Sequence, residues 1–378
     1  MPNERHAVEN ADQKIPRNKQ WDLIRAVGII AVVWGHNFQP PYLFFPPFYF
    51  HLALFFFASG YFFRPKITIK NKLQYSLKKV RSQLLPYFLL NIVFGLVTML
   101  VRPMGIDLGS DLNLQTMFIV PFGRGDQFAL YLAAWFVFNL FFVNILAIWI
   151  YRKSVKANVA FIALAFVLML VSFKIGAAED SSMWLTFICR SFVGFGFFSL
   201  GYLLRLVEPK IQQFIVEPIN IVVLYVIVNF LEVNYGDLSQ HILSSRVNNS
   251  IVIIPVISSI SIILLVYIVA YYGAKVLKEG SLVYQIGRYS YAIMVWHFTF
   301  FFLVNTVLYF LSVIPLSALS NVYFRYDVEK LWLVYQLPAV IGPLVMVWGY
   351  GLIKQKFLKL AQKYLTPRYV ALLPHADP

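Results

Sequence analysis

Residues 21–38 read WDLIRAVGIIAVVWGHNF, an apolar stretch whose only polar or charged side chains are Asp22, Arg25, His36 and Asn37. A stretch of this length predicts a helix that crosses a membrane. Arg25 and His36 are separated by about three helical turns, so both side chains lie on one stripe of the helix, roughly 16 Å apart along its axis. One face therefore carries a cation near one end and a titratable imidazole near the other.

The composition of the whole chain indicates a polytopic membrane protein. Of its 378 residues, 60% are hydrophobic and 13% are charged, and the mean hydropathy is +0.68. A soluble domain is about 45–50% apolar and about 25% charged. The apolar segments long enough to span a bilayer are 21–39, 44–63, 84–102, 131–151, 157–173, 183–204, 214–232, 249–273, 282–311 and 331–353. We therefore expect an all-α fold with a ten-helix membrane domain over residues 21–353.

The Lys and Arg residues are distributed unequally between the two sides of these segments. With the N-terminus placed inside, 24 of the 32 lie in the inside regions and 6 in the outside regions, while Arg25 and Arg190 lie within spans. The positive-inside rule then predicts that both termini are cytoplasmic, with an N-terminal tail over 1–20 and a basic C-terminal tail over 354–378. This distribution explains the net charge of +15 without a nucleic-acid partner. Residues 1–20 have no apolar core and are not expected to form a signal peptide.

The second apolar segment and the stretch after it carry further polar candidates. His51 stands near the outer end of the second segment, at a depth comparable to that of the first histidine, and Ser59-Gly60 near the other end permits close helix packing. The basic amphipathic stretch at 64–87 reads RPKITIKNKLQYSLKKVRSQLLPY, and in it Lys78 and Arg81 are one turn apart and face the same way. Such a stretch is either an interfacial helix on anionic lipid or a clamp for a phosphate-bearing ligand.

Other side chains are candidates for lining a site inside the membrane domain. Arg190 is an intramembrane charge without an obvious partner in its own segment, and such residues usually line a cavity. His297 lies in the ninth segment toward the same outer half as the other two histidines. Trp135 and Tyr291 are aromatic side chains that can stack on a sugar ring, although packing is the simpler interpretation for both.

Several of these motifs together resemble acyltransferase family 3. They are Arg25 and His36 with ten residues between them, FHLALFFFASGYFF at 50–63, Lys78-Lys79-Val80-Arg81 with LLPY following, Trp135-Phe136, and GRYSYAIMVWHF at 287–298. The family consists of integral membrane O-acyltransferases that modify bacterial surface and secreted glycans. The resemblance covers about residues 20–360. It implies an acyl-CoA donor, usually acetyl-CoA, that binds from the cytoplasm, and a sugar hydroxyl that is acylated at or near the outer face.

The resemblance also implies roles for individual residues. It makes His36 catalytic, with Arg25 as the other member of the motif. Donor binding in the family is associated with a cytoplasmic Arg-x-x-Arg element, which here reads Lys78 and Arg81. A lysine contacts phosphate as a point charge and lacks the bidentate fork of arginine. Some relatives carry a soluble hydrolase-like domain after the last span, and we expect this chain to resemble those without it, in the bacterial inner membrane, with no metal and no bound cofactor.

The chemistry of the residues agrees with acyl transfer. O-acylation needs a base that takes a proton from a hydroxyl, and histidine is suited to this near neutral pH. Arg25, Lys78 and Arg81 lie on the cytoplasmic side, where they can attract the phosphates of CoA, and the pantetheine arm would deliver the thioester near His36. Asp22 stands one turn from Arg25 and can pair with it. Direct transfer with His36 as base and a covalent acyl-His36 relay both fit this arrangement.

A second class of protein fits some of the same features. Ten spans, an intramembrane arginine and buried histidines also suit a proton-coupled transporter or flippase of a sugar or lipid-linked glycan. Carriers commonly show paired repeats with broken helices, none of which is evident, and Asp and Glu are nearly absent from the spans. We therefore expect an enzyme. Its acceptor (O-antigen, exopolysaccharide or lipid-linked sugar), its acyl group (acetyl or succinyl) and its oligomeric state stay open.

Overall fold

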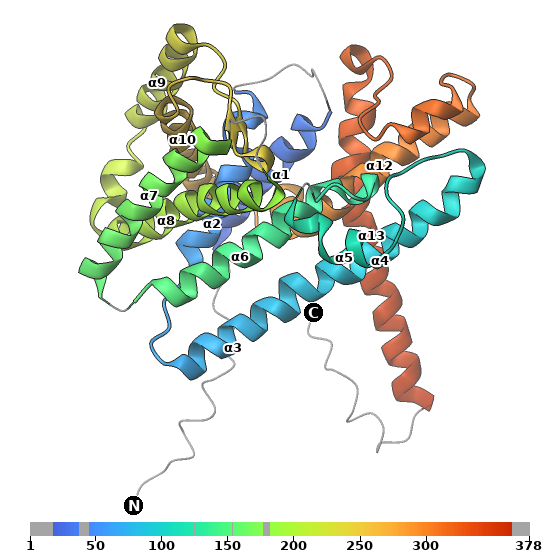
Figure 1. Ribbon diagram of the computed structural model, residues 1–378, viewed down its shortest axis with the longest axis horizontal. Helices are drawn as coiled ribbons and strands as arrows, with labels where there is room; N and C mark the ends of the chain where they lie inside the picture. Colours follow the sequence, from blue (N-terminus) through green and yellow to red (C-terminus); the bar gives the residue numbers. More distant parts are fainter. Residues whose placement is uncertain (1–17, 38–44, 124, 153, 177–181, 365–378) are drawn as a thin grey trace, which may run out of the picture.

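The computed structural model describes residues 18–37, 45–123, 125–152, 154–176 and 182–364, and its architecture is almost entirely helical, as predicted (Figure 1). The α-helices are α1 (Lys19–Gly35), α2 (His51–Phe62), α3 (Ile69–Lys79), α4 (Leu85–Val101), α5 (Leu114–Phe118), α6 (Trp135–Ile150), α7 (Val155–Gly176), α8 (Met183–Ile215), α9 (Ile219–Tyr235), α10 (Ile253–Val276), α11 (Leu282–Arg288), α12 (Ser290–Phe310) and α13 (Val328–Tyr364). Short 3-10 helices cover η2 (Pro47–Tyr49), η4 (Arg102–Met104), η5 (Val120–Phe122), η6 (Ala129–Ala134), η7 (Ile242–Ser244) and η8 (Leu316–Ser320). Two short antiparallel strands of two residues each, β1 (Gln240–His241) and β2 (Arg246–Val247), pair with each other.

Seven helices in the described ranges are long and apolar enough to cross a membrane. They are Ile69–Met104, Ala129–Ile150, Lys156–Gly176, Met183–Ile215, Ile253–Val276, Ser290–Phe310 and Val328–Leu360. The other three predicted segments form shorter helices: α1 and α9 have 17 residues each, and α2 has 12. A hydrocarbon core about 30 Å thick needs roughly 20 helical residues. The count of ten crossings and the cytoplasmic side of both termini therefore stay predictions, and residues 1–17 and 365–378 of the two predicted tails lie outside the described residues.

Two elements differ from the predicted segments. The basic stretch and the third segment form one continuous helix over Ile69–Met104, in which the π-helical turn η3 (Val80–Leu84) joins α3 to α4. The predicted segment 282–311 is instead broken at Tyr289 into α11 and α12. Gly287, in the last turn of α11, lies against α1, since a Cβ there would lie 1.8 Å from the carbonyl oxygen of Asp22. Only glycine lets α11 lie directly on the first turn of α1.

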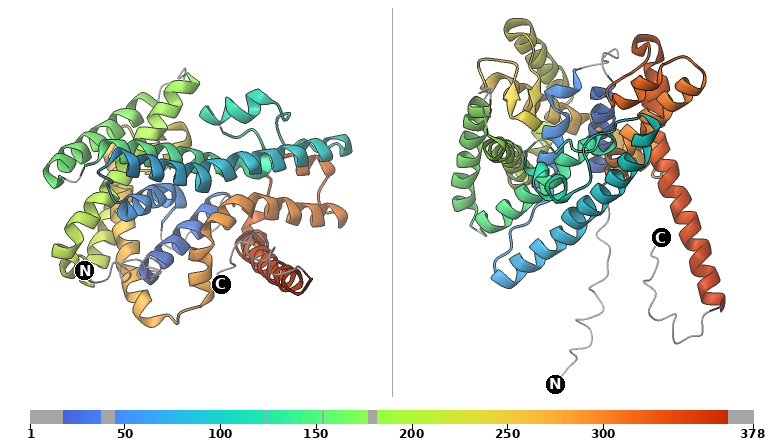
Figure 2. Two further views of the ribbon diagram at one scale, coloured as in Figure 1. Left: turned by 90° about the horizontal axis from the view of Figure 1, so that it is seen from below. Right: turned by 45° about the vertical axis from the view of Figure 1, so that its right-hand side comes forward.

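Helix α1 occupies the middle of the molecule, where it packs against α2, α10, α11 and α12 (Figure 2). Helix α2 in turn packs against the long helix α8 through small residues. A Cβ at Gly60 would lie 1.8 Å from the carbonyl oxygen of Phe198, and one at Gly201 would lie 1.9 Å from that of Phe57. The close packing predicted for Ser59-Gly60 is therefore confirmed.

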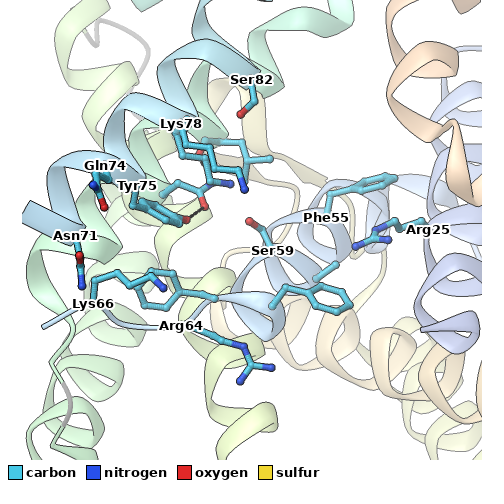
Figure 3. A pocket seen from close by; sticks show the side chains of 16 residues that line it. Arg25, Phe55, Ser59, Arg64, Lys66, Asn71, Gln74, Tyr75, Lys78 and Ser82 are labelled. Carbon is cyan, nitrogen blue, oxygen red and sulfur yellow. Dashed lines mark hydrogen bonds between the residues drawn. The ribbon is translucent and has the colours of Figure 1, made fainter. Parts of the chain in front are cut away.

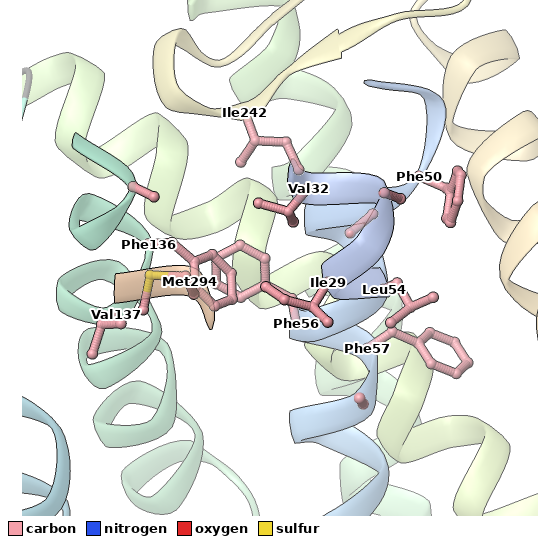
Figure 4. Packing of buried hydrophobic residues seen from close by; sticks show 14 of the residues in the cluster. Ile29, Val32, Phe50, Leu54, Phe56, Phe57, Phe136, Val137, Ile242 and Met294 are labelled. Atoms are coloured by element: carbon pink, nitrogen blue, oxygen red, sulfur yellow. The ribbon is translucent and has the colours of Figure 1, made fainter. Parts of the chain in front are cut away.

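The core around α1 is built from bulky apolar side chains (Figure 4). Ile29 and Val32 of α1 belong to one buried cluster with Phe56, Phe136 and Met294, which come from α2, α6 and α12. The rings of Phe56 and Phe136 meet edge to face at 4.9 Å. This packing fixes α1, and with it the two polar side chains of its stripe, against three other helices.

Candidate active site

His36 caps the C-terminal end of α1, where its backbone N–H donates to the carbonyl of Val32 at 3.3 Å. Its half-buried ring stacks on the ring of His297, with centroids 5.4 Å apart and planes at 24°. The ring of Phe298 lies 4.8 Å from His36 on the same helix as His297. The imidazole of His36 is therefore held between α1 and α12.

His297 is fully buried and has one ring nitrogen committed to the backbone of its own helix. Its Nδ1 lies 3.0 Å and 2.9 Å from the carbonyl oxygens of Ile293 and Met294. A carbonyl accepts only from an N–H, so in the neutral ring Nδ1 carries the proton and Nε2 is an acceptor. Among the described residues Nε2 has no hydrogen-bond partner. The structure therefore brings His297 to His36, as its predicted depth suggested.

A cavity of about 640 Å³, which we call the histidine cavity, contains the side chains of His36 and His51. His51 is buried, and its Nδ1 lies 2.5 Å from the carbonyl oxygen of Pro47. Trp135 and Tyr291, two of the predicted acceptor-site residues, also line this cavity. Its other polar or aromatic lining residues are Phe48, Phe55, Ser82, Gln83, Phe136, Gln240, His241, Ser244, Ser290 and Tyr323. Within the described ranges no three His, Cys, Asp or Glu side chains are grouped as a metal site requires.

A second cavity of about 770 Å³, the cationic cavity, is lined by five positively charged side chains (Figure 3). These are Arg25, Arg64, Lys66, Lys78 and Lys79. In Figure 3 Lys78 and Ser59 point into the same space, while Arg25 approaches it from α1 and Arg64 points away from its centre. Arg25 is paired with Asp22 at 3.2 Å and lies over the ring of Phe62 at 5.0 Å. Among the residues that the structure describes, no acidic side chain lines this cavity, so it is suited to an anion.

The two cavities adjoin, because Phe55, Ser82 and Leu140 line both of them. These three residues, which we call the shared wall, come from α2, from η3 and from α6. The stripe of α1 runs past this wall, so Arg25 lies in one cavity and His36 in the other. The stripe that the spacing predicts for these two residues thus runs from the cationic cavity to the histidine cavity.

The second predicted cation of the basic stretch lies elsewhere. Lys78 lines the cationic cavity, but Arg81 is exposed and lines neither cavity. Arg81 lies in the π turn η3, in which the Leu85 N–H donates to the carbonyl of Val80, five residues earlier. Ser82, four residues after Lys78, lines the cationic cavity with it, as neighbours one helical turn apart can. Arg64, Lys66 and Lys79, which belong to the same basic stretch, supply the other cations.

Arg190 lies away from both cavities, although it is completely buried. Its guanidinium donates to the carbonyl of Gly123 at 3.1 Å and to that of Pro121 at 3.4 Å. It also lies 5.3 Å from the centre of the Trp135 ring. Arg190 therefore holds the loop before η6 by hydrogen bonds and packs against the ring of Trp135.

Sequence reasoning did not select Arg325 or His241. Arg325 lies in the loop between α12 and α13, and its guanidinium donates to the carbonyl of His36 at 3.1 Å. It stacks on Phe301 at 3.8 Å, and partial burial lowers its pKa to about 9, so it stays charged at pH 7. His241, on β1, lines the histidine cavity. Both residues lie in connections between helices, where no hydrophobic periodicity predicts which residues they contact. The only signal in the sequence was that each is a polar residue in a predicted outer loop.

Comparison with known proteins identifies the family of the chain. A family model described as an acyltransferase domain matches residues 18–352, from the start of α1 to within α13. No match was found among curated proteins or solved structures. The matched region contains both cavities and all seven of the long apolar helices described above, at least in part. The chain therefore belongs to acyltransferase family 3 and is a multi-pass membrane acyltransferase.

Proposed function

We propose that the protein transfers an acyl group, most simply acetyl, from cytoplasmic acyl-CoA to a sugar hydroxyl at the outer side of the bacterial inner membrane. The acceptor is a surface or exported glycan, or its lipid-linked precursor. The observation that carries the proposal is the pair of adjoining cavities, one lined by five cations and the other by His36. The distribution of Lys and Arg along the sequence favours placing the cationic cavity on the cytoplasmic side.

The cationic cavity suits the phosphates of CoA. Lys78 and Arg25 approach it from opposite sides, and charged hydrogen bonds to phosphate are among the strongest in proteins (Figure 3). The pantetheine arm then extends past the shared wall and presents the thioester beside His36. The spacing of Arg25 and His36, roughly 16 Å along α1, separates the phosphate end from the reacting end.

In the histidine cavity, His36 acts as the general base. It takes the proton from the sugar hydroxyl, whose oxygen attacks the thioester carbonyl carbon. A C–O bond forms, the C–S bond breaks, and the proton is passed from His36 to the CoA thiolate, which leaves as the thiol. Trp135, Tyr291 and Tyr323 offer aromatic surfaces on which the acceptor sugar can lie. Direct transfer needs no acyl-His36 intermediate and is the simpler mechanism.

The test uses purified protein in nanodiscs with radiolabelled acetyl-CoA and a crude surface-glycan extract. We expect His36→Gln to lower label transfer by about 10²–10⁴-fold while it still binds the donor. Arg25→Gln should weaken donor binding about tenfold, through loss of a charged contact. Arg288→Gln serves as the matched control, because Arg288 is exposed on α11 and lines neither cavity. Transfer by His36→Gln at the wild-type rate would exclude His36 as the base. If the wild type consumes no acetyl-CoA, succinyl-CoA is the next donor.

A further inference from the structure

The π turn η3 lies between α3 and α4, within the continuous helix that runs from Ile69 to Met104. Its cause can be read from the sequence, since Pro86 has no N–H to donate to the carbonyl of Ser82 and its ring crowds that carbonyl. π turns are rare and frequently occur at functional sites. This one lies between the two cavities.

The π turn contains two polar residues, Ser82 and Gln83, at the place where the cavities adjoin. Ser82 belongs to the shared wall, and the next residue, Gln83, lines the histidine cavity. The Gln83 side-chain oxygen is buried and has no hydrogen-bond partner among the described residues. A buried polar atom without a partner costs free energy unless a ligand or water satisfies it. The observation therefore points to a hydrogen-bonding ligand at this position.

The ligand that fits here is uncharged, elongated and amide-bearing. The shared wall contains Phe55 and Leu140 beside Ser82 and no charged side chain, whereas the cations lie only on the side of the cationic cavity. The pantetheine arm of CoA has this chemistry, because two secondary amides alternate with short aliphatic stretches. Resting on the acyl-CoA function proposed above, we infer that Ser82 and Gln83 form a subsite for the pantetheine amides.

This subsite would set the position of the thioester relative to His36. The phosphates fix one end of the donor, and hydrogen bonds from the arm to Ser82 and Gln83 fix its middle. The reacting carbon is then held in the histidine cavity, with less conformational freedom lost at the moment of reaction. Donors that lack the amides should lose this positioning even if their thioester is intact.

Binding of CoA and of 3′,5′-ADP, which lacks the arm, separates the subsite from the phosphate site. Isothermal titration in nanodiscs would compare the wild type with Gln83→Leu and Ser82→Ala. We expect each variant to bind CoA about tenfold more weakly and 3′,5′-ADP as well as the wild type does. Gln115→Leu is the matched control, because Gln115 is exposed on α5 and lines neither cavity. Ser82→Thr, which keeps the hydroxyl, should bind CoA like the wild type.

Three results would overturn the inference. If Gln83→Leu and Ser82→Ala both bind CoA with wild-type affinity, the arm is not held there. If they lose 3′,5′-ADP to the same extent as CoA, the effect belongs to the phosphate site or to folding. If wild-type protein binds neither ligand, the acyl-CoA function itself fails, and this subsite with it.

Discussion

The guanidinium of Arg325 donates to the main-chain carbonyl of His36 at 3.1 Å, although 289 positions separate the two residues. The same guanidinium donates to the carbonyls of Val322 and Phe324 at 2.8 Å and 2.7 Å. Arg325 thus links the connection between α12 and α13 to the end of α1 by hydrogen bonds. The backbone that carries the proposed base is held by a charged side chain that lies outside its own helix.

Arg325→Gln should therefore slow transfer by acting on the position of His36. Loss of the charged hydrogen bonds frees the end of α1, and a displacement of a catalytic group by about 1 Å can cost roughly 100-fold in rate. We expect a lower kcat with little change in the KM for the donor, measured in steady-state assays with acetyl-CoA. Lys330→Gln is the control, because Lys330 is exposed near the same connection and pairs with Asp327. An unchanged kcat in Arg325→Gln would show that this contact is dispensable.

Lys78 and Arg81 provide a matched pair for the donor site, since the sequence predicted the same face for both and the structure separates them. Lys78→Gln removes a cation from the cationic cavity, whereas Arg81→Gln removes one outside it. A charged contact to phosphate is worth about 1.5–3 kcal/mol, so Lys78→Gln should weaken CoA binding by roughly 10–100-fold. Arg81→Gln should bind CoA within about twofold of the wild type at physiological salt. Equal losses in both variants would mean that a place in the lining of the cationic cavity is not what makes a cation bind the donor.

Gly60→Ala should destabilise the protein. The added methyl would lie 1.8 Å from the carbonyl oxygen of Phe198, so α2 and α8 must move apart. Overpacking of this kind costs about 1–3 kcal/mol. Thermal unfolding in detergent would measure the loss. Gly349→Ala in α13 is the control, since a Cβ at Gly349 meets nothing within 4 Å and alanine favours the helix, so this change should not lower the melting temperature. A wild-type melting temperature in Gly60→Ala would contradict the close packing of the two helices.

Arg190→Met should reduce stability without changing donor binding. The substitution keeps a long side chain but leaves the carbonyls of Pro121 and Gly123 without their donor. Each unsatisfied buried group costs roughly 1–3 kcal/mol. The melting temperature in detergent and the Kd for CoA would be measured together, with Lys174→Met, an exposed cation of α7, as the control. A weakened Kd at an unchanged melting temperature would instead place Arg190 on the donor path.

The parts of the site that sequence could predict are those fixed by the geometry of a single helix. The stripe that joins Arg25 to His36 follows from helical periodicity alone, and the structure retains it. The partners of Arg190 are main-chain carbonyls of a loop distant in the sequence. Main-chain groups are the same at every residue, so the sequence does not indicate which of them an arginine contacts. Arg325 reaches His36 only through the folded connection between α12 and α13. Such contacts depend on tertiary packing, so a reading of local patterns cannot supply them.

The break at Tyr289 and the phase of Arg81 were missed for a different reason. In each case a single residue of the sequence is involved, but its structural effect depends on the helix or turn that lies next to it. Gly287 lets α11 pack directly on Asp22 of α1, and Pro86 alters the preceding turn of a helix that continues on both sides. Hydrophobic runs in the sequence give the extent of apolar segments but not where a helix bends or changes phase.

The shared wall has a consequence for the energy supply of the cell. Two water-accessible cavities that adjoin within one membrane protein would form a leak for protons, and a leak dissipates the gradient that drives ATP synthesis. Phe55 and Leu140 place apolar surface where the cavities meet, and only Ser82 among the shared residues is polar. In the proposed orientation, an acyl group would cross at this wall while ions do not. The same three side chains would then separate the two aqueous sides where the cavities meet.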